Sequence, residues 1–475
     1  MTNDLKRREF LQVASGCVLC LGAARTFSSA SDSNPLTVLS PGCIKSKVRV
    51  AKLYAGVPKA LWPTPLMDLN EEMQKYEGEF GRMQKEFADV DFVINRLITQ
   101  PEQVSDLREQ LMDVDGILVI HLSMGISAML AEMLKVGRPT MLFAAPYSGH
   151  EWTSFGALRK TKEGAFLDCI LSSDLKELAA AVRPFRAIHH LREAKIINVS
   201  TNMPQSQFLK SVAGKFGTEI KTIGLEPVMT RYAAVDKNAA EAEAARWTNG
   251  AEKVVEPSRD EIYRSARLAL AFEKLLAEEK ATVITVDCYG SMYRKLPAFP
   301  CVGNVRLNDM GLGGICESDL SSALTHILLQ GLTGKPGFIS DPTMDESVKG
   351  IILAHCLGST KMDGPDGAAA PYKLRTIMER QEGCVPQVTM RVGQAVTQLR
   401  FVGVDSIRYF TGKIIGTPDV DKGCRTKITV EVDGDPQNLW QNWSEGLHRQ
   451  TVYGDITSDL KRFCRFKDVK LLNEA

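Results

Sequence analysis

Short apolar runs alternate with amphipathic segments through the first part of the chain. The runs with the length and composition of strands are 47–54, 90–94, 116–121, 139–144 and 167–171. The segments between them with the spacing of helices that bury one face include 69–87, 101–112 and 127–135. This alternation predicts a parallel sheet that is covered by helices on both faces.

A second cycle of the same kind begins at residue 194, and the pattern changes again near residue 387. The second cycle predicts strands at 194–199, 219–223 and 281–286, and helices at 203–214, 236–251 and 259–280. Beyond residue 387, alternating and β-branched runs separated by glycines predict antiparallel β structure at 388–392, 395–402, 406–415 and 427–432. We therefore expect an α/β fold with two successive Rossmann-like α/β domains, 47–190 and 191–356, followed by a C-terminal antiparallel β-barrel-like domain, 357–475.

The N-terminal residues have the composition of a targeting segment. Lys6-Arg7-Arg8 precedes a moderately hydrophobic run and then small residues, and this order resembles a bacterial twin-arginine export signal. Residues 1–31 are thus predicted to be a signal and residues 32–46 a polar linker, which implies a periplasmic protein that is exported already folded. The alternative is a basic N-terminus on a cytoplasmic protein.

Composition narrows the class of protein further. The 475 residues are 44% hydrophobic and 24% charged, as is usual for a soluble globular chain of two or three domains. The 58 basic and 57 acidic residues leave a net charge of +1, which gives no indication of a nucleic-acid partner or an anionic membrane surface. The eleven cysteines are scattered and odd in number, which favours folding in a reducing compartment. No run after residue 30 is long and apolar enough to predict a membrane span.

Residues 311–341 carry the most informative pattern in the chain. A glycine-rich turn leads to Glu317, an apolar-periodic helix follows over 318–332, and a short apolar strand at 337–340 delivers Asp341. If the strand returns parallel in the same sheet, the two carboxylates meet at the edge where open α/β sheets bind ligands. They could hold a divalent metal or act as an acid and a base. The alternative is a solvated helix-capping Glu and a turn-forming Asp.

This stretch, GGICESDLSSALTHILLQGLTGKPGFISD, resembles the metal-site segment of the L-fucose isomerase family and, more loosely, that of the L-arabinose isomerases. The resemblance implies that Glu317 and Asp341 bind Mn²⁺ or another divalent ion and are the catalytic carboxylates. His448, in a C-terminal segment that also resembles the family, is implied as the third metal ligand. Leu447 stands where fucose isomerases have an Asn, which argues against fucose itself as the substrate.

Other residues are candidates for contact with a sugar. His150 and Trp152 follow a strand end in the first domain, His355 ends the strand at 349–354, and Trp443 lies shortly before His448. For the first two, a loop packed at a domain boundary is an equal alternative, and for His355 so is a buried structural role. In the family the first domain reaches the site of a neighbouring subunit, so the resemblance implies a homo-oligomer, a trimer or a hexamer. His189 and His190 lie at a helix end beside arginines, where a structural role is favoured.

The resemblance implies a metal-dependent aldose–ketose isomerase of carbohydrate metabolism that acts through an enediol on a small sugar. Two alternatives remain open at this point. One is a carbohydrate-binding protein that kept the fold without the chemistry. The other is a metal-dependent epimerase or hydrolase that uses the same carboxylates. A nicotinamide enzyme is not expected, since Cys316 stands where the third glycine of a dinucleotide-binding turn would be.

Overall fold

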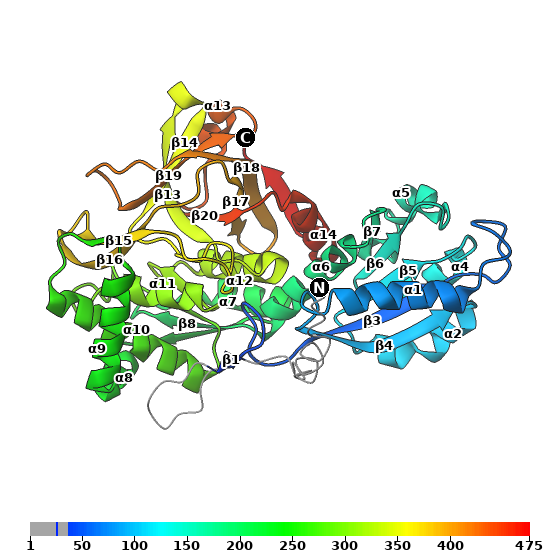
Figure 1. The fold of residues 1–475 in the computed structure, drawn as a ribbon, viewed down its shortest axis with the longest axis horizontal. Coiled ribbons are helices and arrows are strands. Elements are labelled where there is room, and N and C mark those ends of the chain that lie inside the picture. Colours follow the sequence, from blue (N-terminus) through cyan, green and yellow to red (C-terminus); the bar gives the residue numbers. More distant parts are fainter. Residues whose placement is uncertain (1–24, 27–36) are drawn as a thin grey trace, which may run out of the picture.

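A computed structural model describes residues 25–26 and 37–475. It shows a first α/β region set to one side and a second α/β region with a β-barrel above it (Figure 1). The strands of the first sheet stand in the order β4-β3-β5-β6-β7 and are all parallel. Their bounds are β3 Val48–Ala55, β4 Val90–Ile98, β5 Gly116–His121, β6 Thr140–Ala144 and β7 Leu167–Leu171. Every residue of β5 is buried, as expected for a central parallel strand with helices on both faces.

The helices of this region are α1 Leu69–Arg82, α2 Pro101–Asp106, α3 Arg108–Leu111, α4 Ser127–Leu134, α5 Phe155–Leu158 and α6 Glu177–Glu193, with short 3-10 turns η1 Glu151–Ser154 and η2 Gly164–Phe166. Helix α6 leads out of the first sheet towards the second. It packs against a helix of the central region, α12 Leu320–Thr333. A Cβ on Gly331 of α12 would lie 2.5 Å from the Cα of Ala187 on α6, so only glycine allows this approach of the two backbones.

The central sheet is parallel, with the strand order β12-β11-β8-β9. Its strands are β8 Lys195–Val199, β9 Glu219–Ile223, β11 Val283–Val286 and β12 Gly313–Cys316. Besides α12, its helices are α7 Ser206–Phe216, α8 Glu226–Ala234, α9 Lys237–Gly250, α10 Arg259–Glu279 and α11 Cys301–Asp309.

The C-terminal region is a closed antiparallel barrel of the strands β17-β20-β13-β14-β19-β18, in which β17 also pairs with β18. The bounds are β13 Phe338–Asp345, β14 Gly350–His355, β17 Ala395–Val402, β18 Ser406–Gly416, β19 Thr426–Val432 and β20 Arg449–Tyr453. The remaining helical elements of this part are η3 Glu346–Val348, α13 Pro436–Asn442 and α14 Thr457–Lys467, and the strand β21 Lys470–Asn473 lies beside β18. A separate three-stranded sheet is formed by the hairpin of β15 Tyr372–Ile377 and β16 Glu382–Val388, in which β15 pairs with β10 Lys253–Val254.

The predicted fold class is confirmed: two parallel α/β sheets are followed by an antiparallel β-barrel. The expected return of the chain after α12 into a parallel strand of the central sheet is wrong. Strand β13 pairs antiparallel with β14 and β20, and Asp341 lies inside it, opposite Ala354. The free edge of β12 explains why. The Asn308 amide accepts from the backbone N–H of Gly314 at 2.7 Å and donates to its carbonyl at 3.2 Å, so a side chain occupies the edge that a further strand would need.

The predicted signal lies outside the described residues except for Arg25 and Thr26, which form β1 and pair with β2 Thr37–Val38. The described part of the predicted linker, 37–46, is packed against the body, with Cys43 buried. Among the helices of the described residues, none has the length and apolar character needed to cross a membrane.

Candidate functional site

Glu317 lies in a sharp turn between β12 and α12. Both Glu317 and Ser318 have positive φ, 63° and 56°, which costs roughly 1–2 kcal/mol for each residue that is not glycine. The turn is held by the Ser318 backbone N–H, which donates to the Val286 carbonyl at 3.2 Å, and by its hydroxyl, which donates to Asn198 Oδ1 at 2.5 Å. Backbone strain of this kind is concentrated at functional sites. This turn places the Glu317 side chain at the carboxyl edge of the central sheet, facing the barrel.

Side chains from the barrel converge on Glu317. His448, next to the start of β20, has its Nε2 atom 3.2 Å from Asp341 Oδ1 and 3.6 Å from Glu317 Oε2. His355, at the end of β14, has its Nε2 atom 3.7 Å from Glu317 Oε1, and its ring meets the His448 ring edge to face at 5.5 Å. Ligand atoms of Glu317, His355 and His448 all lie within 4.8 Å of one another. The convergence of Glu317 and Asp341 expected from sequence is therefore present, although its geometric basis differs.

Asp319 orients His448 from the side away from Glu317. Its Oδ2 atom is 3.0 Å from His448 Nδ1, so Nε2 faces the other carboxylates. Asp319 is also the N-cap of α12 and accepts from the Ser322 backbone N–H at 2.9 Å. The Arg400 guanidinium donates to Asp319 at 2.7 Å and to the His448 carbonyl at 3.1 Å. Asp319 was not singled out from sequence. An Asp just before an apolar-periodic helix indicates an N-cap, and that signal alone does not reveal a histidine partner from the barrel.

The electrostatics of the site favour a cation at its centre. Burial acts to raise the pKa of Asp319, but His448 and Arg400 hold that pKa well below its usual range. Burial likewise acts to raise the pKa of Asp341, and His448 and His355 lower it. Burial acts to lower the pKa of His448, yet Asp319 and Asp341 raise it to about 10. The two aspartates are therefore ionised at neutral pH, and the imidazole of His448 carries a proton that a divalent ion would replace.

The donor set fits a metal ion. Two buried polar atoms, Asp341 Oδ1 and His448 Nε2, have only their mutual ion pair at 3.2 Å and no hydrogen bond of good geometry, and buried His355 Nδ1 has no hydrogen-bond partner in the described structure. Unpaired buried polar atoms are rare unless an ion, a water or a ligand completes them. Carboxylate oxygens with imidazole nitrogens suit Mn²⁺ and related ions. The tightest cluster of ligand atoms comprises Glu317, His355 and His448, and Asp341 approaches this cluster through His448.

The other sugar-contact candidates are not members of this cluster. His150 and Trp152 are at the carboxyl edge of the first sheet, where the His150 ring lies 4.8 Å from that of Trp62 and Trp152 is 45% exposed. Trp443 follows α13, donates from its indole N–H to the Leu447 carbonyl at 3.2 Å, and has the Arg449 guanidinium 4.3 Å from its ring. Trp443 therefore supports the loop that carries Leu447, whose side chain is 57% exposed.

Comparison with known proteins gives a distant similarity. No known family profile matches the chain. The chain is 23% identical over 308 residues to a sulfoquinovose isomerase of Alkalicoccus urumqiensis, a match that covers 59% of this chain and 66% of the relative. It is also 23% identical over 295 residues to a sulfoquinovose isomerase of Clostridium sp. (strain MSTE9), which covers 58% and 63%. Each match thus spans just under two thirds of the relative's length. The similarity supports the expected resemblance to sugar isomerases at this coarse level.

Proposed function

We propose that this chain is a metal-dependent aldose–ketose isomerase. The observation that carries the proposal is the convergence of half-buried Glu317 and Asp341 with two buried imidazoles at a strained turn beside the central sheet. The similarity to proteins named sulfoquinovose isomerase supports the same reaction class. Glu317, Asp341 and His448 would hold the ion, which we take to be Mn²⁺ or a similar divalent metal, and His355 is in place to share it.

When bound, the ion would supply Lewis-acid stabilisation of the negative charge that develops on the substrate oxygens. The chain itself supplies the proton transfers. One of the two carboxylates, Glu317 or Asp341, would remove the proton from C2 while O1 gains a proton, which gives the enediol. The O2 hydroxyl would then lose its proton while a proton is delivered to C1 with the help of the other carboxylate, so the net change moves one proton from C2 to C1 and one from O2 to O1. The low pKa of Asp341 keeps this carboxylate ionised at neutral pH, so it can accept a proton without first losing one. Asp319 and Arg400 keep His448 oriented throughout, since both are fixed by further hydrogen bonds.

Sulfoquinovose is the first sugar to test, and an anionic substrate would need a cation near the site. A cavity of about 230 Å³ lies beside Cys288 and is also lined by Arg294. Burial is the main cause that raises the pKa of the Cys288 thiol to about 12, and the negative charge of Glu317 adds to it. Among the described residues, the Arg294 guanidinium has no carboxylate partner and lies 5.3 Å from the Tyr293 ring. We expect Arg294→Gln to raise KM for a sulfonated sugar and Lys295→Gln, its exposed neighbour, to leave KM unchanged.

A carbohydrate-binding protein without catalysis is the second candidate. The observation that favours it is Leu447, which is 57% exposed and offers no hydrogen bond to a sugar hydroxyl at the position where the resemblance expects an Asn. In that case the same residues would bind a sugar and a metal without turnover.

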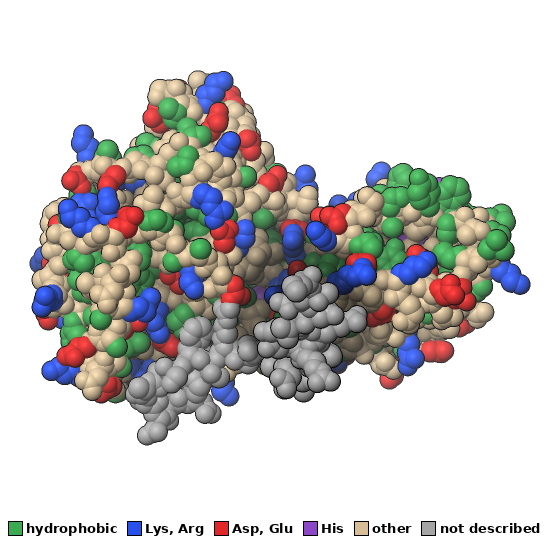
Figure 2. Space-filling view, in the orientation of Figure 1, with side chains coloured by type: hydrophobic (Ala, Val, Ile, Leu, Met, Phe, Trp, Pro, Cys, Tyr) green, Lys and Arg blue, Asp and Glu red, His purple; other side chains and the backbone are tan. Residues whose placement is uncertain are grey.

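A homo-oligomer is part of the proposal. Figure 2 shows hydrophobic side chains gathered over the outer end of the first α/β region. The large exposed ones in this part of the chain include Leu61, Leu66, Tyr147 and Trp152, which are 80%, 91%, 75% and 45% exposed. A patch of this kind marks an interaction site in a stable protein. We take the occupant to be a second copy of the chain, and export to the bacterial periplasm remains part of the same hypothesis.

The test is turnover by purified protein with added Mn²⁺. Sulfoquinovose and a panel of neutral aldoses and ketoses are incubated with wild type and with Glu317→Gln, and the products are separated by chromatography. The proposal expects a ketose from at least one aldose with wild type and none with Glu317→Gln. Binding of a sugar without any product would favour the carbohydrate-binding protein.

A further inference from the structure

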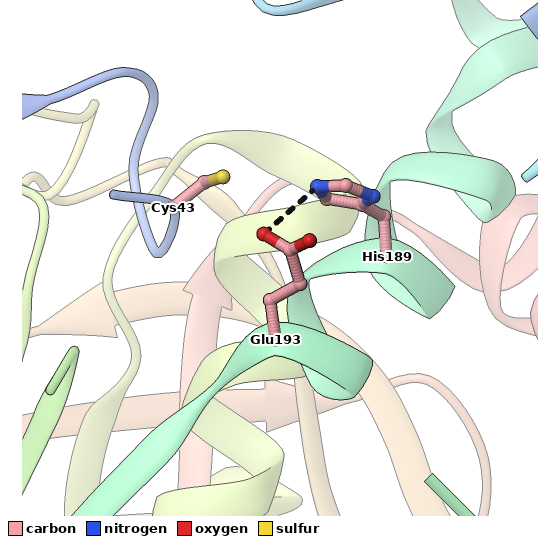
Figure 3. A group of neighbouring side chains, drawn as sticks. All are labelled: Cys43, His189 and Glu193. Carbon is pink, nitrogen blue, oxygen red and sulfur yellow. Dashed lines mark ion pairs between the residues drawn. The ribbon is translucent and has the colours of Figure 1, made fainter. Parts of the chain in front are cut away.

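A second cluster of metal-ligating side chains shares no residue with the Glu317 site. Cys43 comes from the segment 37–46, and His189 and Glu193 stand one turn apart on the same face of α6 (Figure 3). Cys43 and His189 are buried, and Glu193 is half-buried. All three side chains point into the same space between the segment and the helix.

The ligand atoms in this cluster have the separations of a coordination shell. Cys43 Sγ, His189 Nε2 and a Glu193 carboxylate oxygen lie within 4.8 Å of one another, with Nε2 and Glu193 Oε2 3.4 Å apart. The Ser46 carbonyl oxygen lies 3.0 Å from Cys43 Sγ and 2.9 Å from His189 Nε2. A fourth candidate ligand atom, the Ser46 carbonyl oxygen, therefore lies against the same group.

The surroundings prepare the cluster for an ion. Asp115 Oδ2 lies 2.9 Å from His189 Nδ1, so a buried carboxylate orients the imidazole and leaves Nε2 facing the thiol and Glu193. Histidine ligands of metals are held in this way by a carboxylate behind the ring. Asp115 is itself fixed by the Arg192 guanidinium and by the Arg49 backbone N–H at 2.8 Å.

Glu193 directs a buried carboxylate oxygen at the same group. Its Oε1 atom accepts from the Ser46 hydroxyl at 2.6 Å, while Oε2 is buried without a hydrogen-bond partner in the described structure. A buried carboxylate oxygen that lacks a donor is costly, and a cation at that point removes the cost. The nearest cationic group is His189 itself, whose Nε2 atom forms an ion pair with Oε2 at 3.4 Å, longer than an ordinary hydrogen bond. The other nearby cations bind elsewhere: Arg192 pairs mainly with Asp115, and Lys45 donates to the Glu193 backbone carbonyl at 2.7 Å.

The position of Cys43 is set by the backbone around it. Gly42 has φ +84°, and its N–H donates to the Gly311 carbonyl at 2.7 Å. A Cβ at this position would lie 2.9 Å from Gln330 Oε1 and 3.3 Å from His190 Nδ1, so the segment is held tightly against α6 and α12. These backbone contacts of Gly42 hold the Cys43 thiol beside His189 without any ion.

We propose that Cys43, His189 and Glu193 form a structural metal site for a zinc-type divalent cation, separate from the carboxylate site of the proposed function. A thiolate, an imidazole and a carboxylate are ligands that Zn²⁺ accepts in a four-coordinate shell, whereas the Glu317 site contains no sulfur ligand. The ion fastens residues 37–46 to α6 at the junction between the two α/β regions. The competing occupant is a proton on each nitrogen of His189, with Nδ1–H directed at Asp115 and Nε2–H at the Ser46 carbonyl.

Cobalt distinguishes these two occupants and the two metal sites. Full-length protein is stripped with a chelator and titrated with Co²⁺, and the near-ultraviolet sulfur-to-cobalt charge-transfer absorption is recorded. We expect the absorption in wild type and in Glu317→Gln, its loss in Cys43→Ser, and its retention in Cys464→Ser, which removes another buried thiol. Wild type without this absorption, or with absorption that Cys43→Ser retains, would overturn the assignment. The Glu317→Gln result separates the failure of this proposal from that of the proposed function.

Glu193→Gln keeps the fold testable if Cys43→Ser does not fold. It preserves the thiol and the shape of the side chain and removes the charged ligand. Zinc content and affinity should fall at least roughly tenfold in this variant, and Zn²⁺ should raise the unfolding temperature of wild type more than that of Glu193→Gln. Equal zinc affinity and equal stabilisation in the two proteins would show that His189 and Glu193 form only an ion pair around a proton.

Discussion

Asp319→Asn should lower both the stability of the protein and its affinity for Mn²⁺. Asn at position 319 retains the N-cap of α12, because Asn and Asp are about equally good at that position. It also retains an acceptor for the Nδ1–H of His448, which lies 3.0 Å away in the native protein. What it loses is the carboxylate charge that faces both His448 and Arg400.

Two effects of different size follow. Arg400 is 8% exposed and would be left without its counter-charge, which costs about 3–5 kcal/mol in a buried pair. In the native protein the Asp319 carboxylate stabilises a dication at His448 Nε2 more than it stabilises a single proton there. Metal affinity should therefore fall about 10–100-fold, the usual effect of removing a carboxylate behind a ligating histidine.

The comparison needs a control variant that loses the counter-charge of an arginine, and therefore stability, without touching the metal site. Arg186 donates to both oxygens of Asp89, at 2.7 and 2.8 Å, in a buried pair that contacts neither Glu317 nor His448. Asp89→Asn should reduce the free energy of unfolding in urea by a similar amount and leave Mn²⁺ affinity, measured by titration calorimetry at fixed pH, unchanged. If Asp319→Asn is destabilised like the control but binds Mn²⁺ as wild type does, Asp319 holds only Arg400, and its role in orienting His448 is refuted.

Three further predictions rest on the same residues. Glu317→Gln and Asp341→Asn should each lose the metal that wild type retains near stoichiometry, and full metal content in either variant, measured by elemental analysis, would remove that residue from the site. Because the pKa of His448 is raised to about 10 in the folded, metal-free protein, the affinity for Mn²⁺ should rise about tenfold per pH unit between pH 7 and 9. Stabilisation from the charged imidazole is fully present below its unfolded pKa of about 6.5, so metal-free protein should lose stability as pH rises through about 10, and stability that increases over that range in denaturant titrations would contradict this. Replacing Arg7 and Arg8 together by Lys should leave the protein uncleaved in the cytoplasm, and equal periplasmic amounts of both forms in cell fractions would refute the twin-arginine signal.

The sequence predicted the larger elements because their periodicity is strong. The alternation of β5 and α4 with their neighbours, and the long amphipathic α10, are local signals that tertiary contacts do not reverse. The barrel was predicted only from residue 387 onwards. Strands β13 and β14 look like any buried strands in sequence, and only the Asn308 side chain on the edge of β12 shows why they pair elsewhere.

The candidate site was only partly predictable for a similar reason. Glu317 and Asp341 could be paired because a single helix separates them, even though the topology assumed for that pairing was wrong. His448 could be predicted only from the resemblance, since no periodicity places the residue before β20 beside α12. Asp319 and the cluster of Cys43 with His189 are contacts between segments far apart in the chain, and sequence spacing contains no information about them.

Isomerisation in D₂O tests the central claim most directly. Wild type with bound Mn²⁺ is incubated in D₂O with a sugar that it converts, or with sulfoquinovose first, and the product is analysed by mass spectrometry and NMR. Proton transfer through Glu317 and Asp341 predicts a ketose that carries deuterium at the carbon receiving the proton in at least part of the molecules, and no product from Glu317→Gln. A product that keeps all of the substrate hydrogen would contradict the base role of the carboxylates, and no product from any sugar while the metal is bound would contradict the isomerase itself.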